Sequence, residues 1–242
     1  MRRWRRIVVT VIVAMILLAA ALLGLAALRG RPGDVPWVGL DLADPIGWFT
    51  GRKLAALYGD FPHCRALLDR AGVRYSALPS RADGNCGYDD AVRFVPGGAR
   101  TIRFVPPSVG IACPVAAAIA KWEWDVVQPA AWRRLGARVV AIEHLGGYNC
   151  RRLYGRPSGD WSEHAHANAL DVAAFRLADG RRVAVVKDWT GGGAKAAFLR
   201  DVRDGGCRLF ATVLSPDYNA AHRDHLHLDQ APRGALGWRA CR

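Results

Sequence analysis

A long apolar run near the N-terminus is the strongest hydrophobic pattern in the sequence. Residues 7–28 are interrupted only by Thr10 and Gly24, and four arginines precede them. A helix of this length covers about 30 Å, which is the thickness of the hydrocarbon core of a bilayer. We expect residues 1–29 to be a transmembrane anchor with a cytoplasmic N-terminus, because flanking positive charge stays on that side. The alternative is a signal peptide cleaved near Gly24-Leu25-Ala26.

Shorter patterns follow a predicted juxtamembrane tether at residues 30–60, which is rich in Pro and Gly at its start. Helical spacing of apolar residues predicts helices at residues 63–71, 113–135 and 194–202, the second broken near Pro129. Strand-like runs occur at residues 91–95, 101–105, 138–143, 169–177, 181–186, 209–213 and 226–229. A turn at residues 96–98 joins the strands at 91–95 and 101–105. A second turn at residues 178–180 joins the strands at 169–177 and 181–186. We expect residues 61–242 to form one α+β domain with a central, mostly antiparallel sheet and flanking helices.

The charge of the chain favours an anionic partner. The formal net charge is +13, and six arginines fall within the first 33 residues, which leaves +7 on the remainder. Nucleic acid and an acidic cell-wall polymer both match this balance. The sequence has no aromatic-rich basic motif, helix-turn-helix pattern or zinc-finger spacing, so we expect no nucleic acid partner. The oligomeric state stays open.

The six cysteines fit an exported domain. Their number is even and no two have the spacing of a zinc knuckle or a redox motif, so we expect disulfides. Six cysteines allow 15 pairings. Short loops favour the pairs Cys64–Cys86, Cys113–Cys150 and Cys207–Cys241. With the N-terminal helix, these disulfides predict a single-pass protein of the inner membrane whose domain lies in the periplasm.

Five of the seven histidines lie between residues 164 and 227, which suggests a metal site. Zinc binds imidazole and carboxylate, and a catalytic zinc commonly has three protein ligands and one open position. His164, Asp171 and His227 can supply that set. The odd spacing from His164 to Asp171 requires a turn before the strand that holds Asp171, and strand alternation puts His225 and His227 on one face. We therefore expect Zn²⁺ on strands and their loops.

The sequence around these residues resembles a known group of zinc peptidases. The pattern Ser-x-His-x-x-Gly-x-Ala-x-Asp, followed later by His-x-His, is similar to D-Ala-D-Ala carboxypeptidases, lysostaphin-type endopeptidases and hedgehog signalling domains. Flanking residues 147–151, 162–175, 207–213 and 217–229 are closer to the bacterial extensin-like C-terminal domain family, which is similar to those peptidases. The resemblance covers residues 62–232. Ala167 departs from the pattern, which has glycine at that position.

The resemblance implies roles for residues around the metal. Carboxypeptidases of the group carry an acidic base where this chain has Asp224, and the endopeptidases carry a histidine where it has His225. We favour His225 slightly, since strand alternation directs it to the same side as His227. Arg151 matches an arginine that lies close to the metal in related carboxypeptidases, where a cation stabilises negative charge on the intermediate. We assign supporting roles to three further residues: Ser162 orienting His164, Asp229 orienting His225, and Tyr148 as a second donor.

These residues lead to three hypotheses. The first is a zinc metallopeptidase or amidase of the D,D-carboxypeptidase or endopeptidase type, which hydrolyses an amide bond in peptidoglycan stem peptides with metal-activated water. The second is a non-catalytic, zinc-stabilised binding module of the cell envelope, since hedgehog-like relatives keep the metal for structure or recognition. The third is a metal-free structural envelope protein. The substrate in the first hypothesis comes from the resemblance and the compartment.

Overall fold

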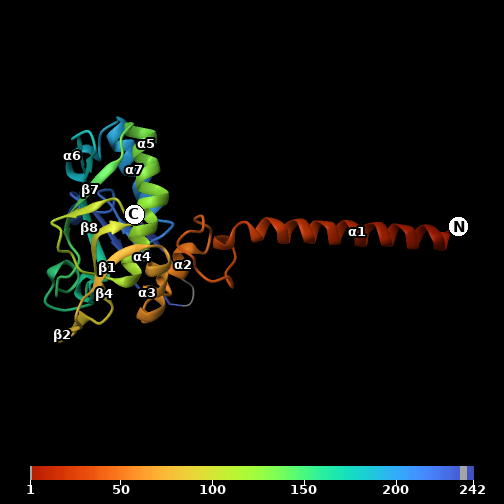
Figure 1. The fold of residues 1–242 in the computed structure, drawn as a ribbon, viewed down its shortest axis with the longest axis horizontal. Helices are drawn as coiled ribbons and strands as arrows, with labels where there is room; N and C mark the ends of the chain where they lie inside the picture. Colours follow the sequence, from red (N-terminus) through yellow and green to blue (C-terminus); the bar gives the residue numbers. More distant parts are fainter. Residues whose placement is uncertain (1, 235–238) are drawn as a thin grey trace.

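The N-terminal helix α1 (Arg2–Arg29) projects away from a single folded domain (Figure 1). The computed structural model describes residues 2–234 and 239–242. Within α1, residues Arg3–Leu25 are long and apolar enough to cross a membrane, and none of them is buried against the domain. This helix is a signal or an anchor. Together with the disulfides, it indicates that the domain lies outside the cytoplasm.

The segment after α1 is packed against the domain. It contains the short helix η1 (Pro32–Asp34), α2 (Thr50–Ala55) and α3 (Phe61–Arg70). Leu40 and Leu42 belong to the hydrophobic core. The buried ammonium group of Lys121 donates hydrogen bonds to the carbonyl oxygens of Leu42 and Asp44. These contacts fix the position at which the chain leaves the end of α1.

The main sheet has the strand order β12-β10-β11-β8-β7-β5, and β9 pairs with β8. Its strands are β5 (Arg103–Val105), β7 (Val139–Gly146), β8 (Ala169–Leu177), β9 (Arg182–Ala184), β10 (Thr212–Leu214), β11 (Leu226–Asp229) and β12 (Ala240–Cys241). Neighbours are antiparallel except for the parallel pairs β5–β7 and β10–β12. The prediction of an α+β domain with a mostly antiparallel sheet is confirmed.

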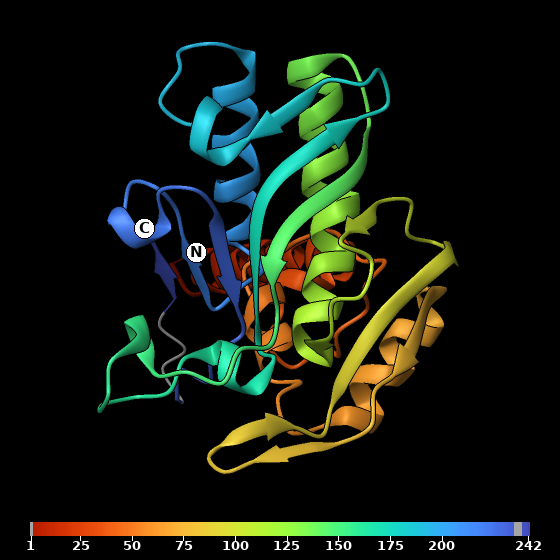
Figure 2. The ribbon, with the colours of Figure 1, turned by 90° about the vertical axis from the view of Figure 1, so that its left-hand side faces the viewer.

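A long helical segment and α7 (Ala194–Gly206) cover the sheet, and β7 and β8 run alongside the helical segment in Figure 2. The helical segment consists of α4 (Cys113–Trp122), the π-helical stretch η2 (Glu123–Val127) and α5 (Gln128–Leu135). The predicted break near Pro129 is thus a change of helical register, which tolerates the missing N–H of proline. Trp122 joins helix and sheet, with its ring centroid 5.8 Å from Phe175 and 6.3 Å from Phe210.

A smaller sheet, β1-β4-β6, lies beside α3 and contains β1 (Val73–Ala77), β4 (Ala91–Gly98) and β6 (Ile111–Ala112). The two-stranded β2 (Arg81–Asp83) and β3 (Cys86–Tyr88) extend from it. The predicted pairing of residues 91–95 with 101–105 is wrong, because β5 joins the main sheet. The buried carboxylate of Glu123 accepts hydrogen bonds from the backbone of Thr101 and Ile102 and draws the chain away from β4.

Two of the three predicted disulfide pairings are wrong. All six cysteines form disulfides, and the pairs are Cys64–Cys113, Cys86–Cys150 and Cys207–Cys241. The first joins α3 to α4 and the second joins β3 to the loop after β7. Loop length favoured shorter connections, but the packing of α3 against α4 decides which Cβ atoms come close enough to bond. Only the Cys207–Cys241 pairing is confirmed.

Candidate metal centre

The site forms where two neighbouring strands and one loop meet. Asp171 on β8 and His227 on β11 are direct antiparallel partners. His164 lies on the short helix η4 (Glu163–His166), immediately before β8. The Ser162 side chain caps this helix by accepting a hydrogen bond from the His164 N–H at 3.4 Å. The predicted turn between His164 and the strand of Asp171 is therefore present.

The side chains of His164, Asp171 and His227 converge and are buried. One potential ligand atom from each residue lies within 4.8 Å of the others. His164 Nε2 is 3.2 Å from His227 Nδ1 and 3.1 Å from Asp171 Oδ2, and His227 Nδ1 is 2.9 Å from Asp171 Oδ1. Three donor atoms from residues far apart in the sequence thus surround one point.

The hydrogen bonds of the two histidines turn a lone pair of each toward that point. His164 Nδ1 lies 2.9 Å from the carbonyl oxygen of Gly147, which only accepts, so Nδ1 carries the proton and Nε2 is free to bind a metal. His227 Nε2 lies 3.0 Å from Asp229 Oδ2, which leaves Nδ1 as its ligand atom. Two imidazole lone pairs and a carboxylate at this separation repel one another unless a proton or a metal ion lies between them. The donor set therefore fits a divalent metal.

The charges of the cluster depend on whether a metal is bound. Burial alone would lower the pKa of His227, but its hydrogen bonds to Asp171 and Asp229 raise that pKa to about 9. Burial alone would raise the pKa of Asp171, but hydrogen bonds from His164 and His227 hold it well below its usual range. Without a metal, His227 is therefore an imidazolium at neutral pH. A metal must displace that proton, so binding releases a proton and weakens as the pH falls.

The cluster opens into a cleft of about 960 Å³, which is large enough for a peptide segment. His225 lines this cleft, and its Nε2 lies 3.5 Å from Asp171 Oδ1. Its Nδ1 lies 2.9 Å from Asp224 Oδ1, so the two residues that compete for the role of base are hydrogen-bonded to each other. Arg151 also lines the cleft. Its charge is among the causes that lower the pKa of His222, after burial and the two neighbouring histidines.

The supporting residues differ in part from expectation. Asp229 orients His227 rather than His225, because alternate residues share a face of β11 and Asp229 is two residues from His227 but four from His225. Tyr148 packs edge-on against Tyr88, with ring centroids 5.4 Å apart, and the Arg81 guanidinium lies over its ring. Tyr148 is not among the residues that line the cleft.

His222 lines the cleft, whereas the sequence left it open between a substrate contact and a residue of loop structure. Its ring centroid lies 5.2 Å from that of His225 and 6.0 Å from that of His227. Asn219 Oδ1 lies 2.7 Å from its Nδ1. Burial, followed by the charges of His227 and His225, lowers the pKa of His222 to about 4. Its spacing three residues before His225, on the turn η5 (Ala220–His222), is the sequence feature that points to the cleft.

Ala167 adopts the conformation for which the family pattern has glycine. Its φ is 54°, in the left-handed region, and the residue is fully buried. Its carbonyl oxygen accepts a hydrogen bond from Ala112 N–H at 2.8 Å, and its N–H donates to the carbonyl oxygen of His164 at 3.2 Å. The loop thus keeps the geometry that places His164, at a backbone cost that glycine would avoid.

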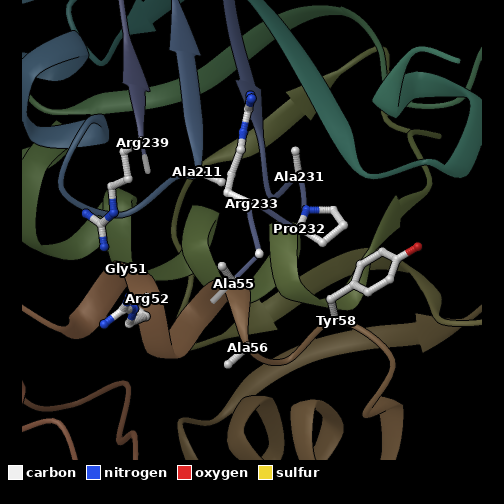
Figure 3. Close-up of a pocket in the computed structure, with 11 residues that line it drawn as sticks. Gly51, Arg52, Ala55, Ala56, Tyr58, Ala211, Ala231, Pro232, Arg233 and Arg239 are labelled. Carbon is white, nitrogen blue, oxygen red and sulfur yellow. The ribbon is translucent and has the colours of Figure 1, made fainter. Parts of the chain in front are cut away.

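A smaller pocket of about 310 Å³ adjoins the cleft and shares Ala231, Pro232 and Arg233 with it. Its residues are drawn in Figure 3. Alanine side chains from α2 and the sheet line its centre, and Tyr58 and arginines stand around it. The Arg233 guanidinium points away from Arg52 and Arg239 and donates a hydrogen bond to Thr212 Oγ1. The cleft beside the buried cluster therefore continues into a partly basic part of the surface.

These features define an α+β domain with a buried His-Asp-His group that could hold a metal ion, attached to an apolar N-terminal helix. The model of the family "Extensin-like protein C-terminus" matches residues 62–242. The chain therefore belongs to the extensin-like C-terminal family, and the resemblance noted in the sequence is confirmed. No curated protein and no solved structure matches the chain.

Proposed function

We propose that this protein is a membrane-anchored, zinc-dependent peptidase or amidase that cleaves an amide bond in peptidoglycan stem peptides in the periplasm. The observation that carries the proposal is the convergence of His164, Asp171 and His227 on the floor of an open cleft. A purely structural metal site is normally closed by a fourth protein ligand, whereas a catalytic one keeps an open position. His225 lines the same cleft, with its Nε2 3.5 Å from Asp171 Oδ1.

Zinc is the best match to the donors. Two borderline imidazole nitrogens together with one harder carboxylate oxygen suit zinc in a four-coordinate site with one solvent position. When bound there, the metal would acidify a water molecule and polarise the substrate carbonyl. Asp229 and the Gly147 carbonyl oxygen hold the two histidines in the required tautomers.

Two cleft residues have roles in the proposed reaction. His225 Nε2 accepts a proton from the attacking water and returns it to the leaving amine, while Asp224 holds the ring through Nδ1 and stabilises its protonated form. Arg151 places a fixed positive charge near the developing oxyanion. This arrangement gives the two candidate bases of the sequence different tasks, with the histidine facing the reaction and the aspartate behind it.

The substrate follows from compartment and charge. The N-terminal helix and three disulfides place the domain outside the cytoplasm, where peptidoglycan is the abundant amide polymer of a bacterial envelope. The stem peptide carries free carboxylates, and the basic residues around the cleft, Arg151 and Arg233, complement them. Cleavage of D-amino-acid peptides is the activity that this combination supports.

The test measures metal content and hydrolysis on the same purified full-length protein. Wild type should bind one equivalent of zinc and cleave purified muropeptides, detected by mass spectrometry. His164→Ala should lose both. His225→Ala should keep the metal and lose at least about 100-fold in kcat, the usual contribution of a positioned base. Zinc binding by the wild type without hydrolysis of any muropeptide would instead support the non-catalytic binding module.

A further inference from the structure

Two exposed tryptophans lie close to the end of the apolar helix. Trp37 is 82% exposed and Trp48 is 85% exposed, whereas Val35, Leu40 and Leu42 of the same segment are buried. The segment therefore packs its smaller apolar side chains against the domain and leaves its two tryptophan side chains in contact with solvent. Tryptophan is enriched where a protein meets the boundary between lipid headgroups and acyl chains, since its ring is apolar and its N–H is polar.

The backbone holds Trp48 beside the end of α1. Its N–H donates a hydrogen bond to Asp34 Oδ1 at 2.8 Å, and the Phe49 N–H donates to the Gly33 carbonyl oxygen at 2.9 Å. Gly33 and Gly47 touch so closely that a Cβ on Gly47 would lie 2.2 Å from the Gly33 carbonyl carbon. The loops of this segment lie where α1 meets the domain in Figure 1. The backbone at Trp48 is thus held against Gly33 and Asp34, which follow the end of α1 closely in the sequence.

Arginines from two other segments gather beside Trp48. Arg208, in the turn after α7, and Arg239, before β12, line a hollow of about 440 Å³ together with Trp48. Arg208 donates to the Ile46 carbonyl oxygen at 2.8 Å, and Arg239 donates to the Arg208 carbonyl oxygen at 2.7 Å. Figure 3 shows Arg239 reaching from the sheet toward Gly51, next to Arg52 on α2.

The positive charge of this group is concentrated. Burial lowers the pKa of Arg239, and the nearby charges of Arg52 and Arg208 lower it further. The hydrogen bonds of Arg208 and Arg239 go to backbone carbonyl oxygens, which do not cancel a full charge. Asp34, the acidic residue that also lines the hollow, pairs with Arg31 at 3.0 Å. An anion in the hollow would relieve the repulsion among the arginines.

We propose that this face of the domain binds anionic phospholipid headgroups of the membrane that α1 crosses. Trp37 and Trp48 enter the interfacial layer, and Arg208 and Arg239 contact the lipid phosphates. The interfacial layer adds several ångströms beyond the hydrocarbon core, so a residue held beside the end of α1 reaches it without rearrangement. The domain is thereby held against the bilayer instead of turning freely on its helix.

The first experiment places the full-length protein in nanodiscs of phosphatidylcholine, with or without phosphatidylglycerol, in which the acyl chains are brominated near the glycerol. The emission contributed by the two tryptophans is the difference between wild type and the double variant Trp37→Ala/Trp48→Ala. We expect that emission to be quenched in discs with phosphatidylglycerol. Trp132→Ala is the matched control, since Trp132 is 59% exposed on α5 and its emission should stay unquenched.

The second experiment tests the arginines in the same discs. A basic side chain near an anionic surface changes the ratio of docked to undocked domain about fivefold, so Arg208→Gln should lower the docked-to-undocked ratio derived from the quenching by that factor. Arg138→Gln, which removes an exposed arginine before β7, should leave quenching unchanged. Equal quenching in phosphatidylcholine alone would overturn the proposed selectivity for anionic headgroups.

Two further results would overturn the proposal as a whole. One is unquenched emission of Trp37 and Trp48 in discs that contain phosphatidylglycerol. The other is an intact mass of the mature protein that lacks residues 1–26, because α1 would then be a removed signal and could not hold this face at a membrane. Neither result bears on zinc binding or hydrolysis, which are measured separately.

Discussion

The ion pair of Arg100 and Glu123 and the cluster of His164, Asp171 and His227 are both buried, and they differ in what surrounds them. Arg100 and Glu123 form an ion pair of 2.9 Å with side chains 6% and 0% exposed. The Glu123 carboxylate also accepts hydrogen bonds from Thr101 and Ile102, and the Arg100 guanidinium stacks 3.9 Å from the ring centroid of Phe94. The two opposite charges of this pair balance each other from within the chain, which is the arrangement of a structural element.

The cluster of His164, Asp171 and His227 has the opposite character. Its donor atoms point at one another, and its open side faces the cleft. The comparison shows that burial of charge does not by itself identify a functional site. What distinguishes the two clusters is that the charges of the ion pair balance each other, whereas the histidine cluster presents three donor atoms that could hold a metal ion.

The largest expected effect is on stability and concerns the ion pair of Arg100 and Glu123. Glu123→Gln leaves the buried Arg100 guanidinium without its counter-charge, so we expect a loss of about 3–5 kcal/mol in the free energy of unfolding. Denaturant titration measures it, and the metal content of the remaining folded protein should stay at the wild-type level. The matched control is Glu143→Gln, which removes a more exposed carboxylate from Arg176 and Arg182 and should cost less than about 1 kcal/mol. Equal losses of unfolding free energy in both variants would show that the buried ion pair of Arg100 and Glu123 stabilises the fold no more than the more exposed pairs of Glu143.

The second effect concerns how the stability of the metal-free protein depends on pH through His227. The pKa of His227 is raised to about 9 in the folded state, so its stabilisation is present below its unfolded pKa and is lost as the pH rises toward 9. We expect metal-free protein to lose up to about 3 kcal/mol of unfolding free energy between pH 6.5 and 9.

Metal-loaded protein should show the reverse trend, because the bound metal requires His227 without its extra proton. Thermal unfolding with and without a chelator at both pH values measures the difference. Parallel pH profiles for the two forms would contradict the assignment of His227 as a metal ligand.

The third effect tests the carboxylate behind the metal ligand. Asp229→Asn keeps the size of the side chain but weakens the hydrogen bond that fixes the His227 tautomer. Residues that support a metal ligand in this way change metal affinity about 10- to 100-fold, and we expect a loss within that range in a competition titration with a zinc chelator. Asp224→Asn is the control, since its partner His225 is not a proposed ligand, and its zinc affinity should stay unchanged.

The smallest effect concerns the loop that carries His164. Ala167→Gly removes the cost of a left-handed conformation at a residue with φ of 54° but adds flexibility to the unfolded chain. These opposing contributions should leave a net stabilisation below about 1 kcal/mol. Zinc affinity should be unchanged, since the loop already has its required shape. A clear loss of stability would show that the buried methyl group contributes more than the backbone strain costs.

The sequence predicted the elements of the site better than their surroundings. Local patterns were sufficient for the hairpin of β8 and β9 and for the strand β11, because alternation and turn residues act over a few positions. They were insufficient for β4 and β5, whose separation depends on Glu123, more than 20 residues away. They were also insufficient for the disulfides, since contact between α3 and α4 decides the partner of Cys64.

By itself, the sequence determined the apolar N-terminal helix, the even set of cysteines and the three residues that can bind a metal, because each of these depends on composition or short spacing. The tertiary structure decided which histidine nitrogens face the candidate metal position, that Asp229 is hydrogen-bonded to His227, and that His222 lies in the cleft. It also placed Arg208 and Arg239 beside Trp48. Such contacts join residues far apart in the chain, and only the packing of helices and strands brings them within range of one another.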